Sequence, residues 1–306
     1  MPPRDPVNLV LLFSSGVLDP EDYKQIARRV RAVADNVSIY IHEDRAPDRA
    51  LIERLAKHRT LVFSPTQIKA FMVTRGRVYA GRPMHKSEQL LRLQLAGVPV
   101  PEWAALDRGK RFDPPHWGEY VVVKPETNSG ARGVKIIKTR TLSDYGVSVE
   151  QFKRDRGNFV VQKVVYNHAF GKIRIQTLFD EVLFARLFRF LEPVRFDTDA
   201  DMQNYQRLFV TENTKAEHFD SPEVFALAKQ CFRTFDDVAM LALDVLLDEA
   251  GNPFFIEANP GGNTWHFSSA IVGQMLRARG VFLEQQFGAF DRAGDVLAKR
   301  ALQEAI

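Results

Sequence analysis

Two apolar runs joined by a short polar turn restrict how this chain can fold more than any other feature. The first run spans residues 240–247 and the second spans residues 254–257, and the turn between them reads Asp248-Glu-Ala-Gly-Asn. This pattern predicts an antiparallel β-hairpin. The hairpin places Asp244 and Glu257 at facing positions. The sequence therefore predicts that two carboxylates meet within an otherwise apolar ribbon.

Asn259 adds a third oxygen donor to this pair. Side chains alternate across a strand, so Glu257 and Asn259 point to one face. Two carboxylates and an amide oxygen suit Mg²⁺, which completes its shell with phosphate oxygens and water. Acidic residues near a hairpin usually only keep it solvated, and Asp248 and Glu249 in the turn fit that role. Asp244 and Glu257 differ because apolar residues flank them, where an unpaired charge is costly. We predict a metal site at these three residues, with Mn²⁺ as the alternative ion.

A second polar segment follows an apolar strand predicted over residues 120–124. Lys124 ends this strand, and a loop containing Ser129, Gly130 and Gly133 leads into the next. Glycines let backbone N–H groups approach an anion, Ser129 can donate a hydrogen bond, and Lys124 supplies a positive charge. The segment predicts a phosphate-binding loop, although a Ser-Gly-x-x-Gly hairpin is also a common turn. It is neither a Walker A loop nor a dinucleotide-binding fingerprint.

The first 80 residues alternate short β-branched runs with capped amphipathic helices, which is typical of a small α/β unit. The predicted strands span residues 8–13, 37–42 and 60–63. One helix follows the N-cap signal Asp19-Pro20, a second is predicted over 48–57, and a capping box at Ser64 predicts a third. The order β-α-β-α-β indicates an open, parallel sheet with right-handed connections.

A helix predicted over residues 86–96 ends in Gly97-Val-Pro-Val-Pro, which indicates a domain boundary. Beyond it, further strands are predicted over residues 120–124, 134–137, 159–163, 174–179 and 182–186, a helix over 222–236, and a C-terminal helical stretch over 283–306. We divide the chain into an N-terminal domain (1–85), a connecting helix with a first subdomain (86–165) and a second subdomain with the metal site (166–306).

Composition excludes several function classes. The net charge of +4 comes from 42 basic and 38 acidic residues without a dense basic run, which argues against nucleic acid as a partner. No apolar run approaches the roughly 20 residues that cross a bilayer, so we expect no membrane partner and a cytoplasmic location. The single cysteine, Cys231, recurs with apolar residues at helical spacing, which predicts a buried structural thiol. The oligomeric state stays open, with a homodimer as one alternative.

Together, these segments resemble the ATP-grasp superfamily, in which two α/β subdomains clamp ATP. Lys124 and the loop after it are similar to the family's lid strand and phosphate loop, and Asp244, Glu257 and Asn259 are similar to its Mg²⁺ ligands in identity, order and spacing. Lys86, at the head of a helix, resembles a phosphate-contacting lysine. In the family, one strand links the two subdomains and its backbone pairs with adenine. That strand is similar to the run Gln162, Lys163, Val164 and Val165 of this chain. The resemblance implies an N-terminal open parallel-sheet domain followed by an ATP-grasp fold of two α+β subdomains.

Within the superfamily, the motif order looks closest to glutamate-adding ligases that modify ribosomal protein, and D-alanine–D-alanine ligases are a more distant likeness. The resemblance implies an ATP-dependent carboxylate–amine ligase that forms an amide or peptide-like bond through an acyl phosphate and releases ADP and phosphate. It implies small carboxylate and amine substrates such as amino acids or peptides. Arg174 and Arg189 would be the catalytic residues that supply charge to the transferred phosphoryl group. The N-terminal domain and residues 196–220 are expected to build the acceptor pocket.

The chain also departs from the family pattern. Relatives usually place an acid soon after the linking strand to hold the ribose hydroxyls, but residues 166–172 contain none. Lys163 stands where related ligases often carry an acid. Two other functions remain open from the sequence: an ATP-grasp kinase that phosphorylates a small molecule, and a nucleotide-binding module without turnover. Trp265, just after the metal segment, is expected to lie in the core.

Overall fold

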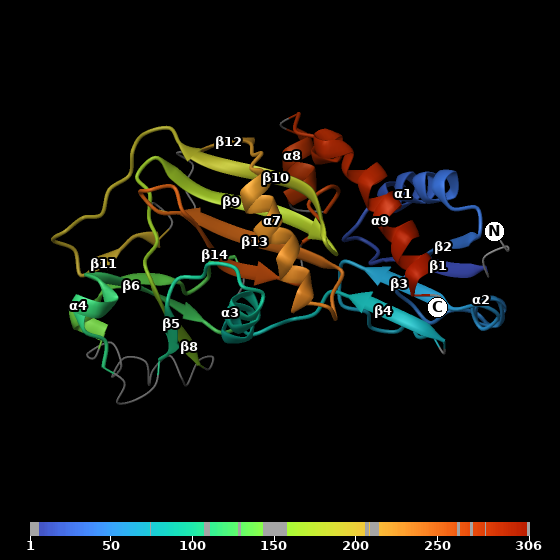
Figure 1. Ribbon diagram of the computed structural model, residues 1–306, viewed down its shortest axis with the longest axis horizontal. Coiled ribbons are helices and arrows are strands. Elements are labelled where there is room, and N and C mark those ends of the chain that lie inside the picture. Colours follow the sequence, from blue (N-terminus) through green and yellow to red (C-terminus); the bar gives the residue numbers. More distant parts are fainter. Residues whose placement is uncertain are drawn as a thin grey trace.

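Three β-sheets organise the chain (Figure 1). The computed structural model describes residues 6–304 except 74, 107–110, 128–129, 143–157, 206–207, 209–213, 262–263, 270–271 and 279. The N-terminal sheet has four parallel strands in the order β2-β1-β3-β4. These strands are β1 (Val7–Phe13), β2 (Val37–Glu43), β3 (Thr60–Ser64) and β4 (Gly76–Ala80). The predicted parallel α/β unit is confirmed.

Side-chain caps begin the two helices of this unit. Asp19 accepts a hydrogen bond from the backbone N–H of Glu21 at the start of α1 (Pro20–Val33). Asp48 accepts one from Leu51 at the start of α2 (Arg49–Leu55). Each cap satisfies an N–H group that has no partner inside its helix. The two helix starts therefore follow directly from the sequence.

The helix predicted from the capping box at Ser64 is wrong. The chain continues from β3 through a loop over residues 65–73 and then forms β4. The Ser64 hydroxyl accepts from the N–H of Thr66, two residues on, whereas a capping box uses the N–H three residues on. The Asp44 carboxylate accepts from the N–H groups of Lys69, Ala70 and Phe71. These groups are thus satisfied from another segment, and a helix does not form.

Two antiparallel sheets form the rest of the molecule. The lid sheet has the order β11-β7-β6-β8-β5, and the core sheet has the order β12-β10-β9-β13-β14. The lid strands are β5 (Trp103–Ala105), β6 (Tyr120–Pro125), β7 (Lys135–Lys138), β8 (Phe159–Lys163) and β11 (Met202–Gln203), with α4 (Pro114–Trp117) beside them. The core strands are β9 (Phe170–Leu178), β10 (Glu181–Phe190), β12 (Thr214–His218), β13 (Met240–Leu247) and β14 (Pro253–Asn259).

Helices cover one face of the core sheet and leave the other to the lid sheet. Leu90 of α3 (Lys86–Leu95) and Ala228 of α7 (Pro222–Gln230) pack with Leu243 of β13 and Phe255 of β14. Cys231 lies fully buried in this cluster, and burial raises the pKa of its thiol to about 12, which confirms the predicted structural role. On the opposite face, apolar side chains of both sheets form a separate cluster.

The C-terminal helix returns to the N-terminal sheet. After α8 (Val272–Ala278), α9 (Ala289–Gln303) packs along α1 and against β1, as Figure 1 shows. Trp265 lies in the same cluster with 1% of its surface exposed, as predicted. The fold class expected from the sequence is therefore confirmed. Among the described residues, no helix combines the length and the apolar character that a membrane span needs.

Candidate active site

A cleft runs between the lid sheet and the core sheet, and β6 and β14 supply facing side chains along it. Tyr120 and Val122 of β6 face the core sheet, where they meet Phe254 and Ile256 of β14. Further along, Lys124 is 4% exposed and donates a hydrogen bond from Nζ to the carbonyl oxygen of Ile256 at 3.2 Å. The cleft is thus apolar at one end and becomes charged where β6 ends.

A β-bulge places both hairpin carboxylates on the cleft side. Asp244 pairs with Glu257, whereas Val245 pairs with Phe255, so β14 carries one extra residue, Ile256. In an unbroken strand Glu257 would lie on the face of Phe255, against the helices. The bulge turns Glu257 to the face of Asp244. The predicted meeting of the two carboxylates therefore depends on a local irregularity.

Two cations from β9 neutralise Asp244, which is 5% exposed. Arg174 lies directly opposite it, with Nε 2.7 Å from Oδ1 and Nη2 donating to Oδ2 at 3.0 Å. Lys172 places its Nζ 3.7 Å from Oδ2. Sequence reasoning missed Lys172. The signal was available, because Lys172 stands two residues before Arg174 and thus on the same face of the strand.

Lys86 and Lys124 complete the charged end of the cleft. Lys86, the first residue of α3, is buried, and its Nζ lies 2.7 Å from Oε1 of Glu257. With Lys172 and Arg174, four cationic side chains surround the two carboxylates Asp244 and Glu257. Buried charges require compensation, and this cluster carries an excess of positive charge. It is therefore suited to receive an anion with several negative charges, such as a triphosphate.

Burial and mutual repulsion shift the pKa values in this cluster. Burial is the main cause that lowers the pKa of Lys124 to about 8; Lys86 lowers it further, while Glu257 and Asp244 oppose the shift. Burial alone would raise the pKa of Asp244, but Arg174, Lys172 and Lys124 hold it below its usual value. The attraction of Asp244 raises the pKa of Lys172, but burial and Arg174 outweigh it, and the net shift is downward.

Asp244, Glu257 and Asn259 fit a magnesium ion by their donor chemistry. Asn259 donates through Nδ2 to the carbonyl oxygen of Ala242 at 3.4 Å, which leaves its Oδ1 for a cation. Among the described residues, no group of three or more His, Cys, Asp or Glu side chains is placed to hold a metal. Two carboxylates with one amide oxygen form an open ligand set, and phosphate oxygens and water would fill the remaining positions.

The glycine-rich loop is described in part. Gly130 and Gly133 adopt positive φ angles of 64° and 76°, in the left-handed region that favours glycine. The N–H of Val134 donates to the carbonyl oxygen of Ala131 at 3.2 Å, which closes a turn before β7. Ser129 lies outside the described residues. The two glycines therefore serve the backbone geometry of the loop.

The linking strand β8 and the residues after it border the apolar part of the cleft. Gln162 is 1% exposed, and its Nε2 has no hydrogen-bond partner in the described part of the chain. Gln162, Lys163 and Val165 border a narrow space of about 10 Å³, closed on the other side by Tyr205 and Ile256. The side chain of Lys163 turns aside to Glu102, with Nζ 2.8 Å from Oε2. This arrangement leaves the Nε2 group of Gln162 without a partner beside a narrow slot.

Arg189 lies apart from the charged cluster. It stands on β10, where its Nε is 3.2 Å from Oε2 of Glu217 and its guanidinium lies 4.5 Å from the centre of the Phe170 ring. Neither partner belongs to the cluster around Asp244. The structure thus brings Arg174 to the predicted metal ligands and places Arg189 elsewhere on the core sheet.

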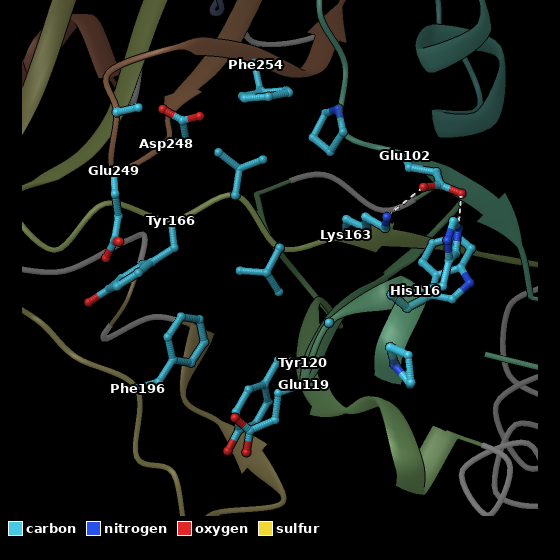
Figure 2. A pocket seen from close by; sticks show the side chains of 17 residues that line it. Glu102, His116, Glu119, Tyr120, Lys163, Tyr166, Phe196, Asp248, Glu249 and Phe254 are labelled. Carbon is cyan, nitrogen blue, oxygen red and sulfur yellow. Dashed lines mark hydrogen bonds and ion pairs between the residues drawn. The ribbon is translucent and has the colours of Figure 1, made fainter. Parts of the chain in front are cut away.

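Two larger cavities lie at the ends of the cleft. The outer pocket, of about 820 Å³, lies beside Lys163–Tyr166 and the β13–β14 turn (Figure 2). The inner pocket, of about 440 Å³, lies beyond the charged cluster, next to Lys86 and Asn259. It also borders Gln67 of the N-terminal unit and Glu126, the residue after β6. The charged cluster therefore lies between two cavities of ligand size.

Comparisons with solved structures identify the architecture. The D-cycloserine synthetase DcsG matches with a TM-score of 0.54 at 14% identity, over 96% of this chain and 99% of that one. D-alanine–D-alanine ligase from Bacillus anthracis matches with a TM-score of 0.51 at 14% identity, over 97% of this chain and 99% of the ligase chain. The ATP-grasp ligase PsnB, in complex with a precursor peptide and AMPPNP, matches with a TM-score of 0.51 at 13% identity, over 98% of this chain and 99% of the PsnB chain. No protein-family profile and no curated protein sequence matches the chain. The chain has the fold of the ATP-grasp ligases.

Proposed function

We propose that the protein is an ATP- and Mg²⁺-dependent carboxylate–amine ligase. The observation that carries the proposal is the cluster of four cations around Asp244 and Glu257, at the inner end of a cleft bordered by the linking strand. This combination suits a nucleoside triphosphate, because the apolar part can take the base and the charged part the phosphates. The ATP-grasp fold supports the proposal, since its solved relatives include ligases.

Each part of ATP has a proposed place along the cleft. Lys86 and Lys124 bind the phosphates, together with backbone N–H groups of the loop that contains Ser129, Gly130 and Gly133. The base lies against the linking strand, where it meets Gln162 and the backbone of Lys163, Val164 and Val165. Asp244, Glu257 and Asn259 hold Mg²⁺, which would neutralise the phosphates and leave the protein to orient them.

The acceptor substrates are proposed to bind in the inner pocket. In open parallel sheets, ligands bind beyond the carboxyl ends of the strands. Ser14 and Thr66 lie just after β1 and β3, with their hydroxyl oxygens 2.9 Å apart, and Gln67 of the same loop borders the pocket. An acceptor held there would lie between the N-terminal domain (1–85) and the two subdomains (86–165 and 166–306).

The proposed reaction has two steps. A substrate carboxylate oxygen attacks the γ-phosphorus and ADP leaves; an amine then attacks the acyl carbon, and phosphate leaves as the new amide forms and loses a proton. Arg174 lies where negative charge would accumulate and is proposed to stabilise it. Arg189 would have to leave Glu217 to take part. Because the similar ligase PsnB was solved in complex with a precursor peptide, amino acids and short peptides are the first substrates to test.

An ADP-release screen tests this function. Amino acids and short peptides are offered in pairs with Mg²⁺-ATP, and phosphate and ADP are measured. The ligase predicts release that needs both an acid and an amine, together with a product of the summed mass less water. A stable phosphorylated product without any amine would contradict the ligase in favour of a kinase. Mg²⁺-dependent ATP binding without turnover in every pair would favour a binding module.

Nucleotide affinity is expected to fall at alkaline pH. Lys124 binds phosphate in its protonated form, and its pKa near 8 means that this form is lost as the pH rises through 8. Bound phosphate raises that pKa, so binding above pH 8 takes up a proton, and affinity falls by at most about tenfold per pH unit. Calorimetry with Mg²⁺-AMPPNP between pH 7 and 9.5 measures the slope. Lys124→Met should bind Mg²⁺-AMPPNP weakly, and its affinity should depend less on pH. If the affinity of this variant fell as steeply with pH as that of the wild-type chain, another group would be responsible for the titration.

A further inference from the structure

The outer pocket combines aromatic walls with acidic groups. Tyr120 stacks on Phe196, with ring centroids 5.2 Å apart, and Tyr166 and Phe196 pack edge-to-face with centroids 4.7 Å apart. Phe254 closes the opposite side, and in Figure 2 the Glu249 carboxylate lies beside Tyr166. The hydroxyl of Tyr166 is buried and has no hydrogen-bond partner among the described residues. The pocket thus offers flat apolar surfaces together with unused polar groups.

Three features connect this pocket to the proposed nucleotide site. Its lining includes Lys163 and Val165, which also border the narrow slot. Tyr120 and Lys124 lie on the same face of β6, four residues apart, which is about 13 Å along a strand. A triphosphate whose phosphates lie at Lys124 therefore reaches the outer pocket with its nucleoside. The volume of about 820 Å³ accommodates a nucleoside, whereas the slot of about 10 Å³ does not.

Hydrogen bonds fix the β13–β14 turn at the edge of the pocket. The Asp248 carboxylate accepts from the backbone N–H of Asn252 at 2.7 Å and from its Nδ2 at 2.8 Å. Asn167, just after the linking strand, donates through Nδ2 to the carbonyl oxygen of Asp248 at 2.8 Å. The turn is therefore tied both to itself and to the linking segment. Glu249, the next residue, is held in place by its neighbours.

Two of the four pocket carboxylates already have structural partners. Glu102 pairs with Lys163 and with His116, and Asp248 caps its own turn. Within the described residues, neither Glu249 nor Glu119 has a side-chain hydrogen bond or ion pair. Glu249 lies in the turn that is tied to the linking segment, whereas Glu119 lies beside Tyr120 on the lid side (Figure 2). Glu249 is thus the available carboxylate of the turn that is tied to the linking segment.

We propose that Glu249 accepts hydrogen bonds from the ribose hydroxyls of the bound nucleotide. A carboxylate is the group that commonly binds a ribose diol, because its two oxygens accept from neighbouring hydroxyls. The inference rests on the proposed function, since it requires ATP in the cleft. Residues 166–172, which follow the linking strand, contain no acid. The β13–β14 turn would therefore supply the carboxylate that this segment lacks. Glu249 is then a specificity residue that distinguishes ribonucleotides from deoxyribonucleotides.

Calorimetry with Mg²⁺-AMPPNP and its 2′-deoxy analogue tests the assignment without requiring turnover. The wild-type chain is expected to prefer the ribonucleotide by about tenfold, which is the effect of one charge-assisted hydrogen bond. Glu249→Ala should weaken binding of the ribonucleotide, which loses both hydrogen bonds, about tenfold more than binding of the deoxy analogue, which loses only the one from its 3′-hydroxyl, and so bring the ratio close to one. Glu53→Ala, which removes an exposed carboxylate of α2, is the matched control and should keep the wild-type ratio.

Each contrary outcome has its own meaning. An unchanged ratio in Glu249→Ala would overturn this inference and leave the proposed function intact. If Glu119→Ala, and not Glu249→Ala, lost the preference for the ribonucleotide, the ribose would be assigned to the lid side. That result would also overturn the role of Glu249. Tighter binding by Glu249→Ala would show that the carboxylate only repels the phosphates. If the wild-type chain did not bind AMPPNP, both the proposed function and this inference would fall.

Discussion

Glu257→Gln is expected to lower Mg²⁺-dependent ADP release by about 100-fold or more. The change keeps the shape of the side chain but removes a charge from the proposed metal ligand set, and groups that stabilise charge in a transition state commonly contribute this much. It also leaves Lys86, buried and 2.7 Å from Oε1 of Glu257, without a charged partner there. Initial rates with a substrate pair found in the screen, measured over a series of Mg²⁺ concentrations, give the effect.

The matched control for this variant is Glu53→Gln. It makes the same chemical change at an exposed carboxylate whose partner is Arg49, far from the cleft. We expect its rate and Mg²⁺ dependence to match those of the wild-type chain. A Glu257→Gln chain that stays folded and retains wild-type activity would refute the proposed metal site, and with it the mechanism.

Trp265→Ala is expected to lower the free energy of unfolding by about 3–5 kcal/mol, the range for truncating a large buried aromatic side chain. The indole stacks on Tyr23 with ring centroids 5.4 Å apart and lies 6.3 Å from Phe290 of α9. Its Nε1 donates to the buried carboxylate of Asp22 at 2.8 Å. The substitution therefore leaves both a cavity and an unsatisfied acceptor. Urea unfolding followed by circular dichroism measures the loss.

Trp265→Phe separates the two contributions. It keeps much of the apolar volume but removes the N–H group, so its loss should be smaller, about 1–3 kcal/mol. Met72→Ala, at a side chain that is 80% exposed, is the control for truncation and should stay within about 0.5 kcal/mol of the wild-type chain. Equal losses for Trp265→Ala and Met72→Ala would contradict the central position of this indole.

The sequence predicts the hairpin at 240–259 well, because its signals are local. Apolar runs, a glycine-containing turn and flanking acids define β13 and β14 within a residue or two. The bulge at Ile256 could not be predicted, because it is set by packing on both faces of the core sheet. Simple alternation of side chains along β14 predicts that Glu257 and Asn259 share one face. Without the bulge, however, Asp244 would pair with Ile256 and lie on the opposite face. The correct pairing of Asp244 with Glu257 thus required a feature that no local pattern encodes.

Elements without an apolar pattern were missed for a related reason. β12 reads Thr-Lys-Ala-Glu-His and forms the edge of the core sheet, where its residues are only half-buried. Such strands exist because a neighbour offers free hydrogen-bonding groups, in this case β10. The short lid strands β5 and β11 depend on β8 and β7 in the same way. Charged contacts also come from the tertiary fold: Lys86 and Glu257 are far apart in sequence, and only packing of α3 beside β14 joins them.

The return of α9 to the N-terminal sheet affects the order in which the chain can fold during synthesis. Domains generally fold as units while the ribosome extends the chain, the N-terminal one first. Here Ile26 and Val30 of α1 share one core with Phe290 and Leu297 of α9, which are synthesised more than 250 residues later. The first unit to emerge therefore exposes part of its apolar core until the last helix arrives. Ribosome-bound chains that end before residue 289 should accordingly recruit chaperones at α1.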